Sequence, residues 1–216
     1  MQWVLPLCTN LSVRGYYAGG EEMKESYDIL VVGIGGQGTI LASNILGEAC
    51  MIENRPVKGA ETHGMAQRGG SVESHIRIDG RFGPLIAPGT ADIIIAFDML
   101  EAFRYSHYLR PGGKIITNSR LVVPTSVFMQ GLPVPTDKEI LGRLSGYGLC
   151  VIDAEGLAKE AGSLLTQNIV MMGAASQFIP LKTESLVQSV SRLVPPKTLE
   201  ANLKAFELGR VAGSSC

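Results

Sequence analysis

A glycine-rich turn between an apolar run and a helical run is the feature that most constrains the fold of this chain. Residues 28–32 form an apolar run typical of a buried strand, and the sequence Gly33-Ile34-Gly35-Gly36-Gln37-Gly38 follows it directly. From Gly36 to Ile52, apolar residues recur at helical spacing. The order strand, GxGxxG turn, helix is typical of the first unit of a dinucleotide-binding α/β domain.

The remaining pattern predicts further strands that alternate with helices. We expect strands at residues 55–60, 72–78, 91–97, 114–117 and 150–153, and helices at residues 99–109, 138–144, 154–161, 168–178, 183–193 and 196–211. Such alternation favours a largely parallel sheet with helices on both faces, a Rossmann-like α/β fold in a single domain. Residues 1–26 are predicted to be a poorly ordered extension, and Met23 is a candidate start of the compact domain.

Composition excludes several functional classes. The chain has 216 residues and a formal net charge of -1, so no excess positive field holds nucleic acid or an anionic membrane. Apolar runs such as Ile169–Ala175 are too short to span a bilayer. We therefore expect neither a nucleic-acid nor a membrane partner.

The four cysteines, Cys8, Cys50, Cys150 and Cys216, are widely spaced and form no CxxC pair. The spacing lacks the ligand patterns of structural zinc and of cysteine-rich iron–sulfur motifs. Scattered thiols in a chain without a convincing signal peptide favour a reducing cytoplasm over a disulfide framework. We thus expect a cytoplasmic protein without bound metal.

The glycine turn is a candidate phosphate-binding site, because glycine permits close backbone approach and helix-terminal N–H groups attract anions. Tight packing of the first helix on the sheet is the alternative explanation. A dinucleotide site would also need an acidic residue at the end of the second strand. Glu53 precedes that predicted strand and Glu61 follows it, so neither is well placed.

The segment after the second predicted strand carries polar groups. Lys58, Thr62, Gln67 and Arg68 suit a ligand with additional phosphate, or a protein carboxylate. His63 lies there in a glycine-flanked loop and is a functional candidate, whereas His75 and His107 are expected to be structural or solvated. The chain lacks the GxxxxGK[ST], GxSxG and HExxH motifs, so we expect no catalytic residue of its own.

Three segments resemble a known family. They are the run from Asp28 to Gly38, the block ETHGMAQRGGSV from Glu61 to Val72, and the run from Ala91 to Asp98. Together they resemble the gamma-type subunit of 2-oxoacid:ferredoxin oxidoreductases, and within that family the beta subunits of the indolepyruvate enzymes. The likeness covers about residues 27–213, which is taken as the gamma-type catalytic domain.

The resemblance implies a subunit of a complex that oxidatively decarboxylates an aryl-2-oxoacid to its acyl-CoA and reduces ferredoxin. It implies that a large partner subunit carries thiamine diphosphate and the iron–sulfur clusters, and that this domain helps to bind coenzyme A. The expected ligand-binding residues are Gly33, Gly35, Gly36, Gln37, Gly38, Thr39, Lys58, Glu61, Thr62, His63, Gln67 and Arg68. A subunit interface is the alternative role of the loop that begins at Glu61.

Two other functions stay open at this point. The first is a free-standing dinucleotide-dependent dehydrogenase, and the second is a non-catalytic nucleotide-binding adaptor. A further segment, the small-residue run Gly173–Ser176 within an apolar predicted helix, indicates either a buried packing helix or a face that meets the large subunit.

Overall fold

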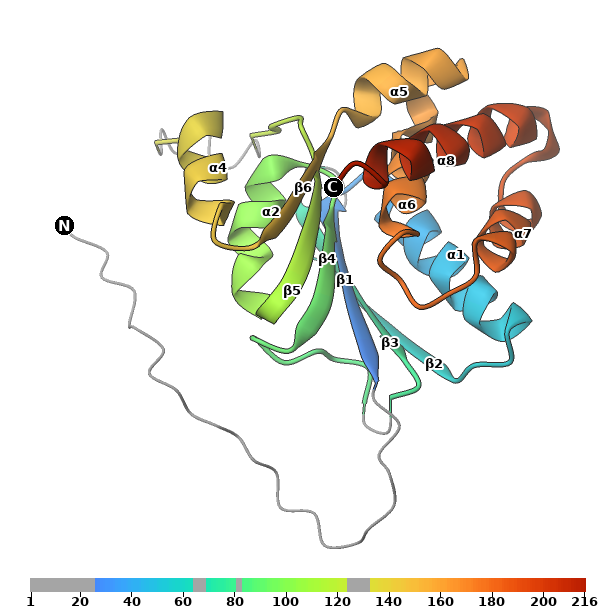
Figure 1. The fold of residues 1–216 in the computed structure, drawn as a ribbon, viewed down its shortest axis with the longest axis horizontal. Coiled ribbons are helices and arrows are strands. Elements are labelled where there is room, and N and C mark those ends of the chain that lie inside the picture. Colours follow the sequence, from blue (N-terminus) through green and yellow to red (C-terminus); the bar gives the residue numbers. More distant parts are fainter. Residues whose placement is uncertain (1–25, 64–68, 81–82, 124–132) are drawn as a thin grey trace, which may run out of the picture.

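The computed structural model describes residues 26–63, 69–80, 83–123 and 133–216. It is an α/β fold in which one six-stranded sheet is covered by helices on both faces (Figure 1). The strand order is β2-β3-β1-β4-β5-β6. The strands are β1 (Tyr27–Ile34), β2 (Val57–His63), β3 (Ser71–Ile78), β4 (Ala91–Ala96), β5 (Leu109–Asn118) and β6 (Gly148–Ile152).

The sheet is mostly parallel, as predicted. Strands β1, β4, β5 and β6 pair in parallel, while β3 pairs antiparallel with both β1 and β2. Strand β1 is buried on both faces because its residues alternate between two hydrophobic clusters. Ile29 and Val31 belong to one cluster, and Leu30 and Val32 belong to the other. This double burial explains why the strand reads as a continuous apolar run.

The larger cluster lies under five helices, α1 (Thr39–Ile52), α5 (Ala154–Ala161), α6 (Gln167–Ala175), α7 (Thr183–Leu193) and α8 (Leu199–Gly213). The smaller cluster lies under α2 (Met99–Tyr105) and α4 (Asp137–Leu144). Short 3-10 turns η1 (Ser106–Tyr108), η2 (Leu164–Thr166) and η3 (Pro196–Thr198) follow or precede helices. In the described part of the chain, each helix falls short of the length and hydropathy of a membrane span.

Helix α6 is a buried packing helix, which decides between the two interpretations of its small residues. Every residue from Asn168 to Ala175 is buried within the chain. Gly173 lies against the backbone of Phe206 on α8, so close that an added Cβ would collide with its carbonyl oxygen. The face that carries these small residues is therefore covered by α8 and is not free to meet another subunit.

Several predicted boundaries were wrong, and local pairing explains them. Strand β2 continues to His63 because its residues pair with β3. Strand β5 begins at Leu109 and includes Pro111. Its pairing with β4 shifts register in this part, because Ala91 pairs with Leu109 but Ile93 pairs with Lys114. A bulge of this kind accommodates a proline that a regular central strand does not tolerate. The predicted helix over residues 99–109 ends at Tyr105 and continues as η1, and the one over residues 168–178 ends at Ala175.

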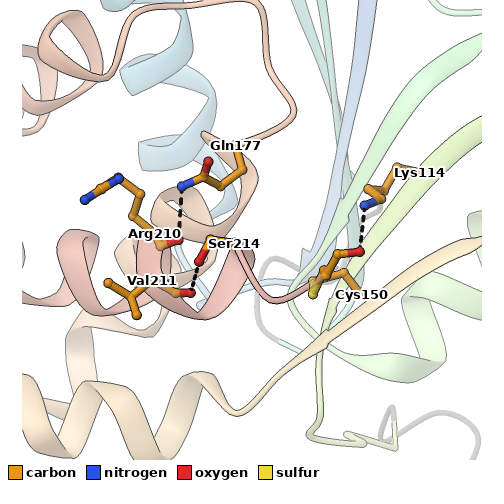
Figure 2. Close-up of a disulfide and its surroundings, with 7 residues drawn as sticks. Lys114, Cys150, Gln177, Arg210, Val211 and Ser214 are labelled. Carbon is orange, nitrogen blue, oxygen red and sulfur yellow. Dashed lines mark hydrogen bonds between the residues drawn. A yellow bond between two sulfur atoms is a disulfide. The ribbon is translucent and has the colours of Figure 1, made fainter.

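The cysteine prediction was also wrong in part. Cys150 on β6 and Cys216 after α8 form a disulfide, with their Cα atoms 5.5 Å apart (Figure 2). The two residues are 66 positions apart in sequence, so only the fold brings them together. Cys50 is buried and free, and the extension predicted at residues 1–26, which holds Cys8, lies almost entirely outside the described residues.

Candidate functional site

The turn between β1 and α1 is built by glycines that other residues could not replace without strain. Gly36 and Gly38 have φ angles of 106° and 85°, in the left-handed region that favours glycine. At Gly33 an added Cβ would lie 2.7 Å from the Gln37 Oε1 atom and 3.2 Å from the Phe97 Cβ atom. The turn is therefore compact because of both backbone conformation and close packing.

The side chain of Gln37 closes this turn from within. Its Oε1 atom accepts a hydrogen bond of 2.7 Å from the Ile34 N–H, and its own backbone N–H donates to the Ile34 carbonyl at 3.0 Å. The Gly35 N–H donates to the Gly70 carbonyl at 2.8 Å, which ties the turn to the residues before β3. The N–H groups of Ile34, Gly35 and Gln37 thus have protein acceptors.

The start of α1 differs from the glycine turn in how its N–H groups are satisfied. Gly38 is its N-cap residue, and no side chain among the described residues caps this helix. The first N–H groups of an α-helix lack partners within the helix and favour a negative charge. The candidate anion site is therefore the first turn of α1, beginning at Thr39, rather than the whole glycine loop.

A pocket of about 220 Å³ lies beside this helix start. It is at the carboxyl ends of β1, β4 and β5, where the chain leaves β1 for one face of the sheet and β4 for the other (Figure 1). Ligands of open α/β sheets bind at such a switch point. The lining residues are Gly36, Gln37, Phe97, Asn118, Arg120, Leu164, Leu165, Gln167, Asn168 and Met171.

Arg120 is the charged side chain among these lining residues. Its side chain is 54% exposed and lies 3.8 Å from the Glu155 carboxylate, a long ion pair in contact with solvent. Such a pair contributes little to stability, so the guanidinium can exchange this partner for a ligand at small cost. Arg120 can therefore donate to a phosphate or carboxylate in the pocket.

Asn118 has a structural role at the same place. Its Nδ2 atom donates to the Phe97 carbonyl at 3.3 Å, and its Oδ1 atom accepts from the Ala154 N–H at 3.2 Å. These bonds join the ends of β4 and β5 to the start of α5. Asn118 therefore lines the pocket, and its side-chain amide is used in these two hydrogen bonds within the chain.

The opposite side of the pocket is apolar and partly open. Leu164 and Leu165 of η2 are 48% and 89% exposed, whereas Phe97 and Met171 are buried. Gln167 and Asn168 follow at the start of α6. The pocket thus combines one cation, amide groups and an exposed apolar lip, a mixture that suits a ligand with both charged and apolar parts.

A buried carboxyl group lies next to the turn. Asp98 is fully buried and caps α2 by accepting hydrogen bonds from the Leu100 and Glu101 N–H groups at 3.0 and 3.1 Å. Burial raises the pKa of Asp98 to about 6, while the hydrogen bonds from these amides and the nearby Gln37 side chain oppose the rise. Asp98 therefore links the turn to α2, on the other face of the sheet.

The predicted residues of the second strand are not brought to this pocket. Lys58, Glu61, Thr62 and His63 all lie on β2, and β3 separates β2 from β1. The Glu61 carboxylate accepts a hydrogen bond of 3.1 Å from the Ser43 hydroxyl on α1. Glu61, Thr62 and His63 were expected in a loop, and pairing with β3 makes them strand residues instead.

Two more predicted residues, Gln67 and Arg68, lie outside the described residues. Of the glycine-turn candidates, the structure places Gly36 and Gln37 in the pocket lining, and Gly33, Gly35, Gly38 and Thr39 beside them. Arg120 and Asn168 were missed by sequence reasoning. No local motif marks them, although Arg120 lies three residues after the predicted strand 114–117, and ligand-binding residues of α/β folds gather after strands.

The described residues do not fit a metal or cluster site. Among them, no three His, Cys, Asp or Glu side chains come together in a way that could hold a metal ion. Burial raises the pKa of the Cys50 thiol to about 11, so this cysteine is a poor ligand and nucleophile.

Comparison with known proteins identifies a family and relatives that this chain matches. The model of the pyruvate ferredoxin/flavodoxin oxidoreductase family matches residues 28–212. The chain is 42% identical over 193 residues to the indolepyruvate oxidoreductase subunit IorB of Thermococcus kodakarensis, covering 87% of this chain and 95% of that one. It is 39% identical over 186 residues to the subunit of the same name from Archaeoglobus fulgidus, covering 84% and 92%.

Solved structures share the fold. The gamma subunit of a keto/oxoacid ferredoxin oxidoreductase from Geobacter sulfurreducens superposes with a TM-score of 0.67 at 26% identity, covering 88% of this chain and 99% of that one. The 2-oxoglutarate:ferredoxin oxidoreductase of Magnetococcus marinus gives a TM-score of 0.69 at 22% identity, covering 89% and 32%. The second likeness supports the fold alone.

Proposed function

The chain belongs to the pyruvate ferredoxin/flavodoxin oxidoreductase family as a subunit of an oxidoreductase complex, and from this premise we propose that the complex acts on an aryl-2-oxoacid. In the proposed reaction the 2-oxoacid loses CO₂, its acyl group is transferred to the coenzyme A sulfur, and the electrons released reduce ferredoxin. The names of the similar subunits support indolepyruvate as the type of substrate.

The proposal assigns thiamine diphosphate, the iron–sulfur clusters and the contact with ferredoxin to a larger partner subunit. The described residues of this chain hold no ligand set that fits a cluster. We therefore assign the electron transfer of this reaction to the partner subunit. Its proposed contribution is to bind and orient coenzyme A at the pocket beside α1.

One observation carries the coenzyme A assignment: Arg120 lines the same pocket as Gly36 and Gln37, which directly precede the start of α1. The cation and the helix start both favour phosphate groups. The leucines of η2 offer an apolar surface to the uncharged part of the same ligand. Lys58, which we expected to join them, lies on β2, so Arg120 replaces it in the proposal.

A dehydrogenase that binds NAD is disfavoured by the sheet order. An NAD site needs an acidic residue at the carboxyl end of the strand next to β1, where it holds the ribose hydroxyls. Here β3 occupies that position in the opposite direction, and Glu61 lies one strand further away. Glu61 therefore lacks the placement that the ribose contact requires.

The test is the affinity of the assembled complex for coenzyme A. We expect Arg120→Ala to raise the KM for coenzyme A roughly tenfold, because it removes a charge-assisted hydrogen bond worth about 1.5 kcal/mol or more. We expect kcat at saturating coenzyme A to change little. Arg120→Lys should retain part of the affinity, since it keeps the charge and loses the bidentate geometry.

Arg192→Ala is the matched control. The Arg192 side chain is 53% exposed and pairs with Glu48 on α1, away from the pocket. Its loss should leave the KM unchanged. An unchanged KM for coenzyme A in Arg120→Ala, in a complex that still co-purifies with its partner, would place the coenzyme A site elsewhere.

A further inference from the structure

The disulfide joins two elements that are distant in sequence, and neither of its cysteines lines the pocket. Cys150 is on the edge strand β6, and Cys216 follows α8 (Figure 2). Cys150 is 1% exposed and belongs to the larger hydrophobic cluster, whereas Cys216 is exposed. Cys216 is thus the exposed residue of the pair and Cys150 the buried one.

Contacts that do not involve sulfur also hold the residues after α8 in place. The Cys216 N–H donates to the Gly213 carbonyl at 3.2 Å, which continues the turn at the end of α8. Lys114 on β5 donates to the Cys216 carbonyl at 3.4 Å (Figure 2). The Lys114 ammonium also lies 3.7 Å from the centre of the Phe178 ring. Because none of these contacts involves sulfur, we expect them to persist after reduction, to keep the two thiols close and to favour re-formation of the disulfide.

We propose that Cys150 and Cys216 form a reversible thiol–disulfide site that a small disulfide oxidises and a dithiol reduces. In the oxidation, the Cys216 thiolate attacks one sulfur of the small disulfide, whose S–S bond breaks and releases a thiolate. The Cys150 thiolate then attacks the Cys216 sulfur, which forms the protein disulfide and releases the second thiolate. The protein dithiol loses two electrons and two protons, and the small disulfide becomes two thiols.

The expected consequence is a change in how firmly α8 is held. The disulfide anchors the segment after α8 to β6. Helix α8 packs on α6 so closely that a Cβ added at Gly213 would lie 2.5 Å from the Ala174 carbonyl oxygen. Reduction removes the covalent anchor but not this packing, so we expect only the last turn of α8 and the residues after it to loosen. This inference is independent of the ligand proposed for the pocket.

The experiment uses the full chain, incubated without oxygen in dithiothreitol or in oxidised glutathione, then alkylated in denaturant and digested with trypsin. Cleavage after Arg143, Lys159 and Arg210 gives residues 144–159, which contain Cys150, and residues 211–216, which contain Cys216. We expect these two peptides to be cross-linked after oxidised glutathione and to be separately alkylated after dithiothreitol. Return to dithiothreitol should reverse the cross-link.

Two variants separate this site from general thiol oxidation. In Cys216→Ser the cross-link cannot form, and hydrogen exchange of residues 209–216 should be fast under both redox conditions. In Cys50→Ala, which removes a buried cysteine outside the pair, the cross-link should form as in the parent chain. In the parent chain, exchange of residues 209–216 should slow at least several-fold on oxidation.

Three results would overturn the inference. The first is separate alkylation of Cys150 and Cys216 after oxidised glutathione. The second is a stable glutathione adduct on Cys216 in the parent chain, because it would mean that Cys150 does not reach the adduct. The third is the same exchange rate of residues 209–216 in the oxidised and reduced parent chain.

Discussion

Glycines serve two different purposes in the β1–α1 turn and in the contact between α6 and α8. In the turn, Gly36 and Gly38 adopt positive φ angles, so the requirement comes from the local backbone. Between the helices, Gly173 and Gly209 lie within ordinary helices, and the requirement comes from the backbone of the facing helix. The comparison shows that the same residue type can be required for a local or for a tertiary reason.

The two regions also differ in how their polar groups are satisfied. The α6–α8 contact is made by backbone and apolar side chains that are buried within the chain. The turn lies next to Asp98, whose Oδ2 atom is buried and has no hydrogen-bond partner among the described residues. Stability at the turn should therefore depend on pH, while stability at the helix contact should depend on side-chain volume.

The largest expected effect comes from adding volume between the helices. A Cβ at Gly209 would collide with the Val170 carbonyl oxygen. We expect Gly209→Val to lower the free energy of unfolding by more than about 4 kcal/mol, because backbone must move to admit the side chain. Urea unfolding measures this loss. Gly209→Ala, with one added carbon, keeps the prediction testable if the valine variant does not fold.

Gly142→Ala is the matched control for this contact. Gly142 lies within α4, and an added Cβ there would meet no atom within 4 Å. The substitution should raise the free energy of unfolding by about 0.5–1 kcal/mol, because alanine favours helix and restricts the unfolded chain. If Gly209→Ala were as well tolerated as Gly142→Ala, the close approach of α6 and α8 would be wrong.

The next effect is the pH dependence of stability at Asp98. Its pKa in the folded chain is about 6, above the usual 3.8, so the folded chain retains a proton that the unfolded chain releases. The contribution of Asp98 to the free energy of unfolding should therefore fall as pH rises from about 4 to about 6. The total change is up to about 3 kcal/mol.

Asp98→Asn tests this effect because asparagine is also a good N-cap residue. The measurement is urea unfolding of the parent chain and the variant across the same pH range, and the difference between the two curves isolates Asp98. The variant should show a shallower fall in stability between about pH 4 and pH 6. Parallel curves would mean that folding does not raise the pKa of Asp98.

A smaller effect is expected at the turn itself. Gly38→Ala places a side chain at a φ of 85° and against the Asn168 side chain. We expect a loss of about 1–2 kcal/mol from the backbone conformation, with an additional loss from the contact. The double variant Gly38→Ala with Asn168→Ala should lose less than the sum of the single variants, which a double-mutant cycle measures. Strict additivity would show that the contact carries no energy.

Much of the fold was predictable because its signals are local. The helices Ala154–Ala161 and Thr183–Leu193 have the predicted bounds, since apolar spacing marks both. Strand β5 was predicted to begin at Lys114 and begins at Leu109 instead. Its first part contains Pro111, which reads as a helix stop, and only pairing with β4 makes it a strand.

Only the glycine-turn residues of the candidate site were predictable from the sequence. Gly36 and Gln37 belong to a recognisable motif, and the structure places them in the pocket lining. Arg120 and Asn168 reach the same pocket from the segments after β5 and η2, which carry no motif of their own. Glu61 belongs to a characteristic block of sequence, yet lies on β2 beyond β3.

The sequence by itself determined the alternation of strands and helices, the glycine turn and the family to which the chain belongs. These depend on residues that are neighbours in the chain, through side-chain periodicity and backbone freedom. Only the tertiary structure decided the insertion of β3 between β2 and β1, the approach of Arg120 to the turn and the pairing of Cys150 with Cys216. Each of these joins residues distant in sequence, and their proximity arises from packing the sheet and helices around a common core.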